Sequence, residues 1–247
     1  MFCENPNHSI KLLNNLGIKK KLIGIHDYNE ISIIKEYSSR INKSIVALIS
    51  DAGSPLISDP GYKLVRHCLH SDIFVTVIPG PTSIIAALQL SSFPINEFYY
   101  AGFIPKSRVL IKKYINEILT IDKTTIFLLP SRKVSICLDI LEEFIEDRKI
   151  CIAKELTKIN EDFFIDYPKK LKKLILEKKI NLKGEFIIVI EAKDKKKSKN
   201  YNTPDIDEEI SKLLLKYSLT DVVQIVHKIS GLPKTKVYKK VLGLKNE

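Results

Sequence analysis

The chain has 247 residues, 45% of them hydrophobic, which is enough for one large or two modest domains with substantial cores. Its 40 Lys and Arg residues outnumber 29 Asp and Glu residues, and the net charge of +11 favours a polyanionic partner. No apolar run of about 18 residues occurs, no basic and apolar leader precedes the first elements, and the four cysteines lie far apart, so we expect no transmembrane helix, no signal peptide and no zinc site.

The first 41 residues predict two helices around one short strand. Helical spacing of apolar residues over 8–16 ends at Gly17, a residue typical of a helix C-terminus. Lys21–Ile25 predicts a strand, and Ile31–Ile41 predicts an amphipathic helix. The polar loop His26–Glu30 lies between them, and its side chains are either solvated or lining a site at the end of the strand.

Two apolar runs, Ile45–Ile49 and Ile73–Ile78, form the centre of the first half. Each is followed by a loop and a helix-like run, and these helices end near His70 and Leu90. Continuous apolar runs of this length are typical of parallel strands that are covered on both faces. Ligands of open α/β sheets bind beyond the carboxyl ends of such strands, so the two loops are the candidate ligand site.

The first loop, Ser50–Gly61, is dense in Gly, Pro, Ser and Asp. Gly permits positive φ and close backbone approach, whereas Pro fixes φ. Asp59 followed by Pro60 predicts a helix N-cap. One such loop is explained equally well as a rigid turn, but a second one, Pro79–Pro81, follows the next strand, and the pair favours a ligand site.

The second half predicts alternating strands and helices. Arg132 and Lys133 fall in the first turn of a predicted helix, where cations oppose the helix dipole, so they are either a solvated pair or held there to bind an anion. The predicted strands are 98–105, 124–129, 149–158, 163–166 and 186–190, and the predicted helices are 110–119, 131–144 and 168–177.

The last 55 residues predict a separate basic module. Lys193–Asn200 has no apolar residue and is expected to be a linker. Three short helices follow between 205 and 241; Ser218 or Thr220 is expected to cap the second one. Short helices with a tight turn and a Lys-rich last helix are typical of a helix-turn-helix-like nucleic-acid module, although a simple packing appendage has the same pattern.

The loop segments 50–62 and 78–83 together resemble the signature of the tetrapyrrole (corrin/porphyrin) methylase superfamily, and most closely its small-subunit ribosomal RNA methyltransferases. The resemblance runs from about Cys3 to about Leu244. It implies an α/β fold with a parallel-sheet N-terminal domain, a mixed-sheet second domain and a small helical extension. The implied boundaries are 1–96, 97–192, a linker at 193–204, and an RNA-binding-like extension at 205–247.

The resemblance also implies an activity. Such enzymes methylate the ribose 2′-hydroxyl of a cytidine in 16S rRNA of the small ribosomal subunit with S-adenosyl-L-methionine, as cytoplasmic homodimers that bind neither metal nor membrane. By the same resemblance, the cofactor would lie in the crevice between the two domains. The residues carried over to its pocket are Asp51, Gly53, Ser54, Pro79, Gly80, Thr82 and Ser83.

Catalytic and RNA-binding candidates follow from shorter matches. The segment 155–158 matches a Glu-Leu-Thr-Lys motif of the family, and 26–30 is similar to a His-Asp-His-Asn-Glu motif. A ribose hydroxyl is a weak nucleophile, so a base or an electrostatic helper is expected, but no residue is singled out as the base. The catalytic candidates are Glu155, Lys158 and Asp27, and the RNA-binding candidates are Arg132, Lys133, Lys158, Lys234 and Lys236.

Three departures from the family pattern keep alternatives open. Family members have a further strand and a Thr-Pro-Ile-Gly-Asn-Leu-like loop before the segment at Cys3, residues 5–7 replace Asp-Thr-Arg, and 129–133 replaces a Glu-Ser-x-His-Arg-like segment. We therefore expect weak methyl transfer from this chain. The alternatives are a tetrapyrrole-type small-molecule methylase and an inactive relic that only binds RNA. Only five of the 40 basic residues are arginine, so the charge is also consistent with a general compositional bias.

Overall fold

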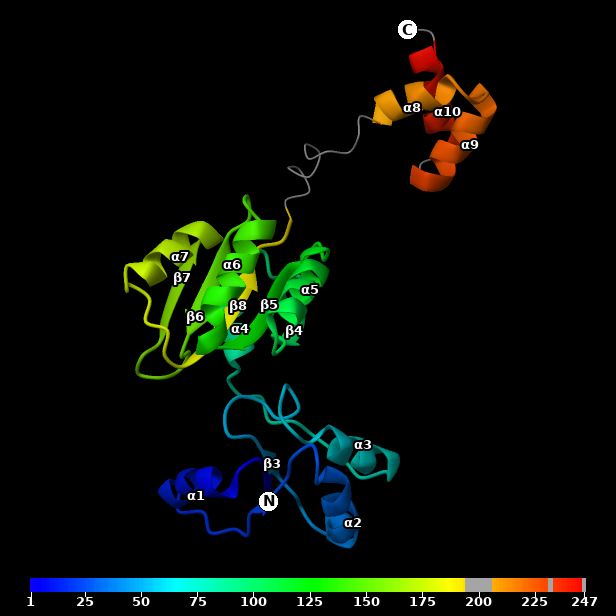
Figure 1. Cartoon of the computed structure of the whole chain (residues 1–247). Coiled ribbons are helices and arrows are strands. Elements are labelled where there is room, and N and C mark those ends of the chain that lie inside the picture. Colours follow the sequence, from blue (N-terminus) through cyan, green and yellow to red (C-terminus); the bar gives the residue numbers. More distant parts are fainter. Residues whose placement is uncertain (194–205, 231–232, 246–247) are drawn as a thin grey trace. The chain divides into compact units, whose positions relative to one another are not determined.

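A computed structural model describes residues 1–193, 206–230 and 233–245 (Figure 1). The chain divides into two compact units, Met1–Ala192 and Lys193–Glu247. Each unit has its own hydrophobic core, and most of the predicted linker lies outside the described residues. No helix in the described ranges is long and apolar enough to cross a membrane.

The first part of unit 1 is a small parallel sheet with helices packed against it. The strands have the order β2-β1-β3, and β1 pairs in parallel with both neighbours. Its core includes Phe2, Ile25, Leu64 and Cys68. The elements are β1 (Phe2–Cys3), α1 (Pro6–Asn15), β2 (Ile23–Gly24), α2 (Glu30–Ile41), β3 (Leu48–Ile49), α3 (Tyr62–His70) and α4 (Ser83–Leu90).

The two strands predicted for the centre of this sheet are largely absent. Of Ile45–Ile49 only Leu48–Ile49 pairs with a neighbour, and Ile73–Ile78 forms no strand. Phe74 and Val77 are exposed to 87% and 79%. A strand exists through its hydrogen bonds to a neighbour, and among the described residues the sheet stops at β3. The predicted parallel pairing is confirmed, but the predicted strand lengths are wrong.

The second part of unit 1 is a five-stranded mixed sheet with the order β4-β5-β8-β6-β7. Strands β4 and β5 are parallel, whereas β8 is antiparallel to both β5 and β6. The predicted mixed sheet is therefore confirmed. The elements are β4 (Phe98–Phe103), α5 (Arg108–Leu119), β5 (Thr124–Pro130), the 3-10 turn η1 (Ser131–Lys133), α6 (Val134–Phe144), β6 (Ile150–Lys154), β7 (Asp162–Asp166), α7 (Pro168–Leu176) and β8 (Glu185–Ile190).

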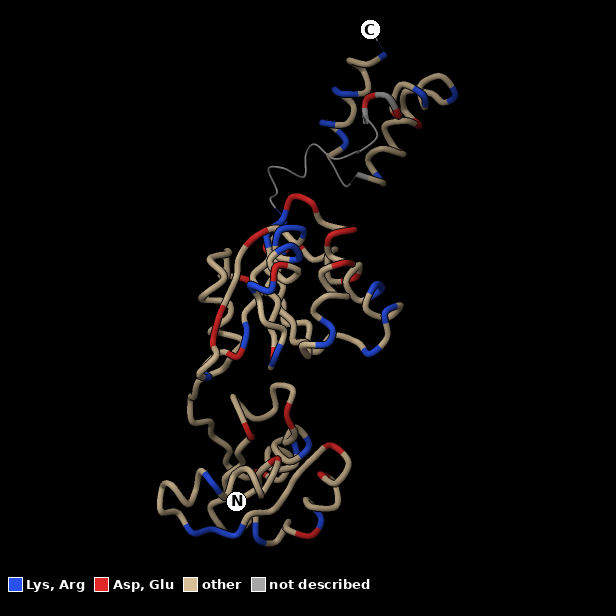
Figure 2. Tube along the Cα trace, turned by 60° about the vertical axis from the view of Figure 1, so that its left-hand side comes forward, with Lys and Arg blue, Asp and Glu red and all other residues tan. Residues whose placement is uncertain are grey.

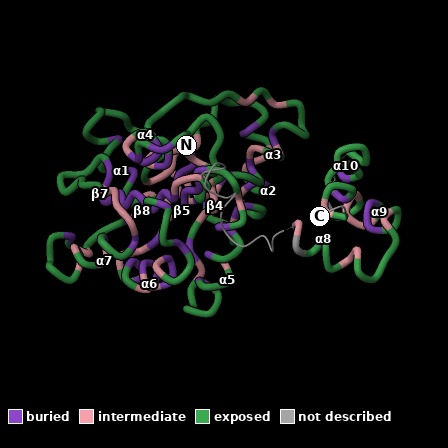
Figure 3. The backbone as a smooth tube through the Cα atoms, turned by 90° about the horizontal axis from the view of Figure 1, so that it is seen from above, coloured by how far each residue is buried: buried purple, intermediate pink, exposed green. Residues whose placement is uncertain are grey.

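Strand β8 shows how the sheet is buried on both faces (Figure 3). Successive side chains of a strand point to opposite faces. Phe186 and Ile188 pack in a core with α5, α6 and α7, whereas Ile187 and Val189 pack in a core with α4. Helix α4 belongs by sequence to the first predicted domain, yet it covers one face of the second sheet. All four cysteines are free and buried, as expected for core thiols.

Unit 2 is a three-helix module built from α8 (Ile206–Leu214), α9 (Leu219–Ser230) and α10 (Lys234–Lys245). Ser218 caps α9: its hydroxyl accepts from the Asp221 N–H at 3.3 Å and donates to the Asp221 carboxylate at 2.6 Å. The predicted cap is confirmed. The core consists of Ile210, Val222, Val223, Val237 and Val241.

Candidate functional site

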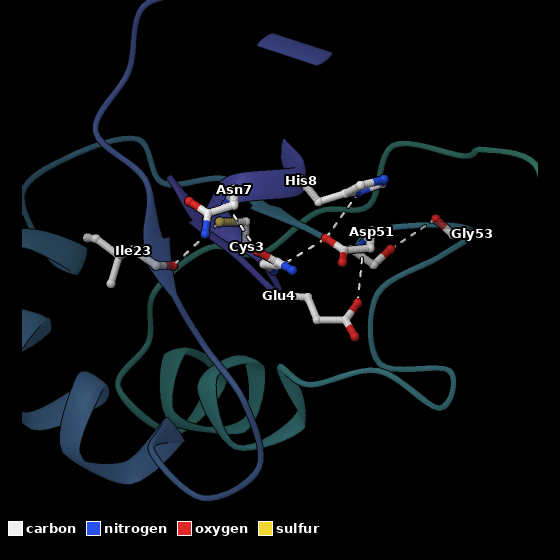
Figure 4. Close-up of polar contacts among 9 residues, drawn as sticks. Cys3, Glu4, Asn7, His8, Ile23, Asp51 and Gly53 are labelled. Atoms are coloured by element: carbon white, nitrogen blue, oxygen red, sulfur yellow. Dashed lines mark hydrogen bonds and ion pairs between the residues drawn. The ribbon is translucent and has the colours of Figure 1, made fainter. Parts of the chain in front are cut away.

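Polar residues gather where β1 and β3 end (Figure 4). Glu4 follows β1, and Asp51 follows β3 after Ser50, and the parallel pairing brings the two residues together. The Asp51 N–H donates to the Glu4 carboxylate at 3.2 Å, and the Asn5 N–H donates to the Asp51 carboxylate at 3.3 Å. His8 of α1 lies 3.5 Å from the same carboxylate. The ends of β1 and β3 therefore form one polar site, which includes Asp51 of the first predicted loop.

Asp59 adds a third carboxylate to this site. Burial raises its pKa to about 6, and the negative charges of Glu4 and Asp51 act in the same direction, against a hydrogen bond from Ser50. The residue does not cap the following helix as predicted, because α3 starts at Tyr62 and Gly61 occupies the N-cap position with φ of 125°. The carboxylates of Glu4 and Asp51 thus act on Asp59, and the negative charge at this site favours a cationic group of a ligand.

The loop between β3 and α3 is held by its own backbone geometry. Leu56 and Ser58 have positive φ, and Gly61 could not carry a Cβ without striking the Leu48 side chain. The Ser58 hydroxyl lies 2.5 Å from the Tyr100 hydroxyl of β4, so the loop contacts the second sheet. A glycine is thus required where the chain turns into α3.

The second loop leads directly into α4. Thr82 is the N-cap residue of α4, and neither its hydroxyl nor that of Ser83 forms a hydrogen bond with a described residue. Gly53 in the first loop and Gly80 in the second have open space where a Cβ would be. Both loops therefore offer unpaired polar groups and accessible backbone to a ligand.

These groups suit the predicted cofactor. S-adenosyl-L-methionine carries a sulfonium, an ammonium and a ribose diol, which pair with carboxylates and hydroxyls. Asp51, Thr82 and Ser83 supply such groups, and Gly53 and Gly80 leave room for them to approach. The described residues hold no cluster of metal-ligating side chains.

The segment 155–158 forms a strained turn at the end of β6. Glu155 and Thr157 have positive φ, and the Glu155 carboxylate accepts from the Glu185 N–H at 2.7 Å. Lys158 donates to Glu155 at 3.0 Å and to Glu185 at 2.9 Å. Backbone strain of this kind persists only where the surroundings enforce it, and it is common at functional sites.

The charges in this turn are fixed. The hydrogen bond from the Glu185 backbone, and then that from Lys158, lowers the pKa of Glu155. The hydrogen bond to Glu185 raises the pKa of Lys158 despite some burial. Lys158 is thus an ammonium and Glu155 a carboxylate at neutral pH.

Lys154, the residue before this turn, was not among the predicted site residues. The residue is only 8% exposed, and its ammonium forms no hydrogen bond or ion pair with a residue that the structure describes, although its charge acts on Glu155. Its ammonium nitrogen is not among the fully buried polar atoms that lack a hydrogen-bond partner, so it reaches solvent. Its position in an apolar strand pattern gave no sequence signal that its ammonium lacks a partner.

The motif 26–30 splits into structural and exposed parts. Asn29 accepts from the His26 N–H at 2.8 Å, and the buried Glu30 accepts from the Leu64 N–H at the start of α3 at 2.8 Å. Asp27 is exposed, and its backbone carbonyl accepts from Lys63. Asn29 and Glu30 therefore have structural roles. Exposed residues of the motif, such as Asp27, are the ones that a substrate can contact.

The predicted RNA-binding residues lie in three places, one of which is Lys158 in the turn after β6. Arg132 is exposed, but Lys133 is buried and donates to the carbonyls of Pro105 at 2.6 Å and Ile104 at 3.4 Å. Burial, and then the nearby Arg132 and Lys106, lowers the pKa of Lys133. An RNA contact by Lys133 stays a prediction and would have to replace these bonds. Lys234 and Lys236 are exposed at the start of α10.

Comparisons with known proteins show the family and the fold of the chain. The family model of the Tetrapyrrole (Corrin/Porphyrin) Methylases matches residues 13–172. The Ribosomal RNA small subunit methyltransferase I of Haemophilus influenzae is 32% identical over 237 residues, which cover 95% of this chain and 84% of that protein. The protein of the same name from Thermotoga maritima is 37% identical over 200 residues, covering 78% and 86%. A crystal structure of diphthine synthase shares the fold, with a TM-score of 0.56 at 14% identity over 77% of this chain and 78% of that one.

Proposed function

We propose that this chain, which belongs to the tetrapyrrole (corrin/porphyrin) methylase family and is therefore an S-adenosyl-L-methionine-dependent methyltransferase, methylates the ribose 2′-hydroxyl of a cytidine in small-subunit rRNA. The observation that carries the proposal is the alignment of nearly the whole chain with proteins named for small-subunit rRNA. The basic helical unit after Ala192 supports it, since phosphate contacts need cations.

The chemistry requires alignment more than covalent help. The cofactor supplies a methyl group on a sulfonium, and the hydroxyl oxygen must approach that carbon in line. In our proposal Asp51, Thr82 and Ser83 hold the polar groups of the cofactor. The Ser58–Tyr100 contact keeps the first loop against the second sheet, which carries the substrate-side candidates.

Lys158 and Glu155 take different roles in this proposal. Lys158 is protonated at neutral pH, so we assign it to a phosphate or to the developing negative charge and not to proton removal. Glu155 and Asp27 remain the candidates for the proton acceptor. Lys154, whose ammonium has no partner among the described residues, is a further candidate for a phosphate contact.

Binding of the RNA would use cations of both units. Arg132 and Lys133 lie in unit 1, and Lys234 and Lys236 in unit 2. We also propose that the protein acts as a homodimer in the cytoplasm, where small ribosomal subunits are available.

The experiment uses the purified 247-residue chain, tritiated S-adenosyl-L-methionine and small ribosomal subunits that lack ribose methylation. We expect slow transfer to one cytidine, because the loop at 79–82 follows a segment without a strand neighbour. Nuclease digestion and mass spectrometry would locate the methyl group. Transfer to a base, or to a tetrapyrrole offered in parallel but not to RNA, would contradict the proposal.

The Asp51→Ala variant tests the cofactor site separately. We expect its affinity for S-adenosyl-L-methionine in calorimetry to fall about tenfold or more, since a charge-assisted hydrogen bond is lost. Asp72→Ala, which changes an exposed acid beyond α3, serves as the control. Unchanged affinity in Asp51→Ala would remove this residue from the site.

A further inference from the structure

A second candidate binding site lies on the exposed side of α5. A hollow of about 470 Å³ opens between the first half of α5 and the end of α6. Its lining residues are Arg108, Val109, Lys112, Lys113, Asn116 and Phe144. The site prediction from sequence included none of them.

The charge of this hollow is positive. Basic residues are spread along the whole chain, so charge alone singles out no face (Figure 2). The segment 106–113, however, holds four cations and no acid. The side chains of Lys106 and Arg108 form no hydrogen bond or ion pair with a described residue. They lie beside the N-terminal end of α5, where the helix dipole also favours an anion.

The other two cations are only partly neutralised. Lys112 lies 2.6 Å from Glu143, and Lys113 lies 3.9 Å from Glu117. All four side chains are about half exposed or more, so these pairs are weak and exchange readily with a phosphate. The three lining cations against these two carboxylates leave a surplus of one positive charge at the hollow, and Lys106 lies two residues before Arg108 in the chain.

Phe144 gives the hollow an aromatic surface. It is the last residue of α6, its ring is 39% exposed, and the Lys112 ammonium lies 5.5 Å from the ring centroid. Asn116 is exposed on the same wall, and its amide can both donate and accept. An aromatic ring flanked by cations and an amide fits a nucleobase with its phosphates.

The hollow continues a basic track toward the predicted RNA-binding residues. Lys133 follows Arg132 in the chain and donates to the carbonyl of Pro105, the residue before Lys106, at 2.6 Å, so Arg132 and Lys106 both lie near Lys133. Arg108 follows Lys106 by two residues at the start of α5. One RNA strand can therefore contact Arg132, Lys106 and the hollow in succession.

We propose that this hollow binds an unpaired stretch of the RNA substrate, with one base stacked on Phe144 and the flanking phosphates on Arg108 and Lys113. The inference rests on the proposed function. It adds a second place, away from the reacting ribose, at which the protein holds its RNA substrate. A paired strand does not fit it, because the bases of an RNA duplex are stacked inside the helix.

The test measures binding of the full chain to a fluorescein-labelled RNA oligonucleotide of about 12 nucleotides by anisotropy. We expect Phe144→Leu, which keeps an apolar side chain but removes the ring, to weaken binding about fivefold or more. We expect Arg108→Ala/Lys113→Ala to lower the slope of log affinity against log salt by about 1.4, as two lost phosphate contacts require.

Matched controls lie on α7 and β7. Lys173 pairs with Glu177 at 3.8 Å with the same sequence spacing as Lys113 with Glu117, and the two lysines have similar exposure, so Lys169→Ala/Lys173→Ala removes equal charge from another element. Phe163→Leu removes a ring of similar exposure from β7. The α7 double variant should lower affinity only through the loss of net charge. Phe163→Leu, which changes no charge, should leave affinity unchanged.

Three outcomes would overturn the inference: no binding by the wild-type chain, a double variant that loses no more than its α7 control, or a Phe144→Leu variant that binds normally. Methyl transfer to small subunits is measured on the same preparations. Transfer that persists while oligonucleotide binding is absent would reject this site and leave the proposed function standing. If the wild-type chain transferred no methyl group to small subunits, the proposed function itself would be rejected.

Discussion

Gly184 holds the strained turn at Glu155 because it has no side chain. Its φ is +95°, and a Cβ at this position would strike the Glu155 carboxyl group. We expect Gly184→Ala to lower the free energy of unfolding by about 1–3 kcal/mol, because the new methyl group breaks the contacts of Glu155 with Glu185 and Lys158. Urea unfolding followed by circular dichroism measures the change.

Gly102 provides the matched control. Its φ is +73°, but nothing lies within 4 Å of the position a Cβ would take. Gly102→Ala therefore reports the cost of the backbone conformation without a clash. If both variants lost the same stability, the contact with Glu155 would not be what makes Gly184 necessary.

Asp59 should make stability depend on pH. Burial, and then the charge of Glu4, raises its pKa from the ordinary 3.8 to about 6, so the folded state holds the proton more tightly than the unfolded state. The contribution of Asp59 to stability therefore falls as pH rises from about 4 to 6. Because the residue is partly exposed, we expect Asp59→Asn to be more stable than wild type by only about 1 kcal/mol at pH 8, and no more stable at pH 4.

The comparison uses thermal melts of both proteins at the two pH values. The control is Asp72→Asn, which removes the same charge from an exposed acid and so corrects for the change of net charge. An equal gain at pH 4 and pH 8 would mean that burial does not raise the pKa of Asp59.

At the scale of elements, α4 connects the second loop to the core of the second sheet. Leu88 is 2% exposed and packs with residues of β5, β6 and β8, whereas Ile85 on the same helix is 42% exposed. We expect Leu88→Ala to cost about 3 kcal/mol, and Ile85→Ala less than about 1 kcal/mol. Calorimetry should also show weaker cofactor binding in Leu88→Ala alone, since α4 begins directly after Thr82. Similar losses in both variants would mean that α4 is not anchored through Leu88.

The elements show which features of the fold the sequence could predict. Helices with apolar spacing, such as α2, α5 and α7, were predicted to within two residues at each end. The predicted strand at 73–78 does not form. Its apolar composition favours an extended strand, but a strand also needs a neighbouring strand to pair with, and composition does not supply one. Propensity is local, whereas pairing depends on the rest of the sheet.

The same limit applies to the site. Asp51 was predicted because it lies in a dense loop after a strand, a feature that the sequence shows directly. The role of Lys133 in binding two backbone carbonyls, and the lack of a partner for Lys154, depend on residues distant in the chain. No spacing within the sequence shows such contacts.

For the whole molecule, the separation into two units predicts that cofactor and RNA binding can be divided. Residues 193–247 hold 13 lysines against seven acids, so 55 residues carry six of the 11 net positive charges. Both units have their own cores, and the cofactor candidates all lie in unit 1. Ending the chain after Ala192 should therefore leave cofactor affinity and the urea unfolding of unit 1 unchanged.

The same truncation should weaken binding to small ribosomal subunits about tenfold or more and make the remaining affinity less dependent on salt, because phosphate contacts are lost with the cations. The Lys234→Ala/Lys236→Ala variant separates the effect of the charges from the effect of losing the whole unit, because it keeps α10. On single-stranded RNA it should lower the slope of log affinity against log salt by about 1.4. If the truncated chain bound small subunits as tightly as the full chain, the three-helix unit would be a packing module, and the RNA contacts would have to lie on unit 1.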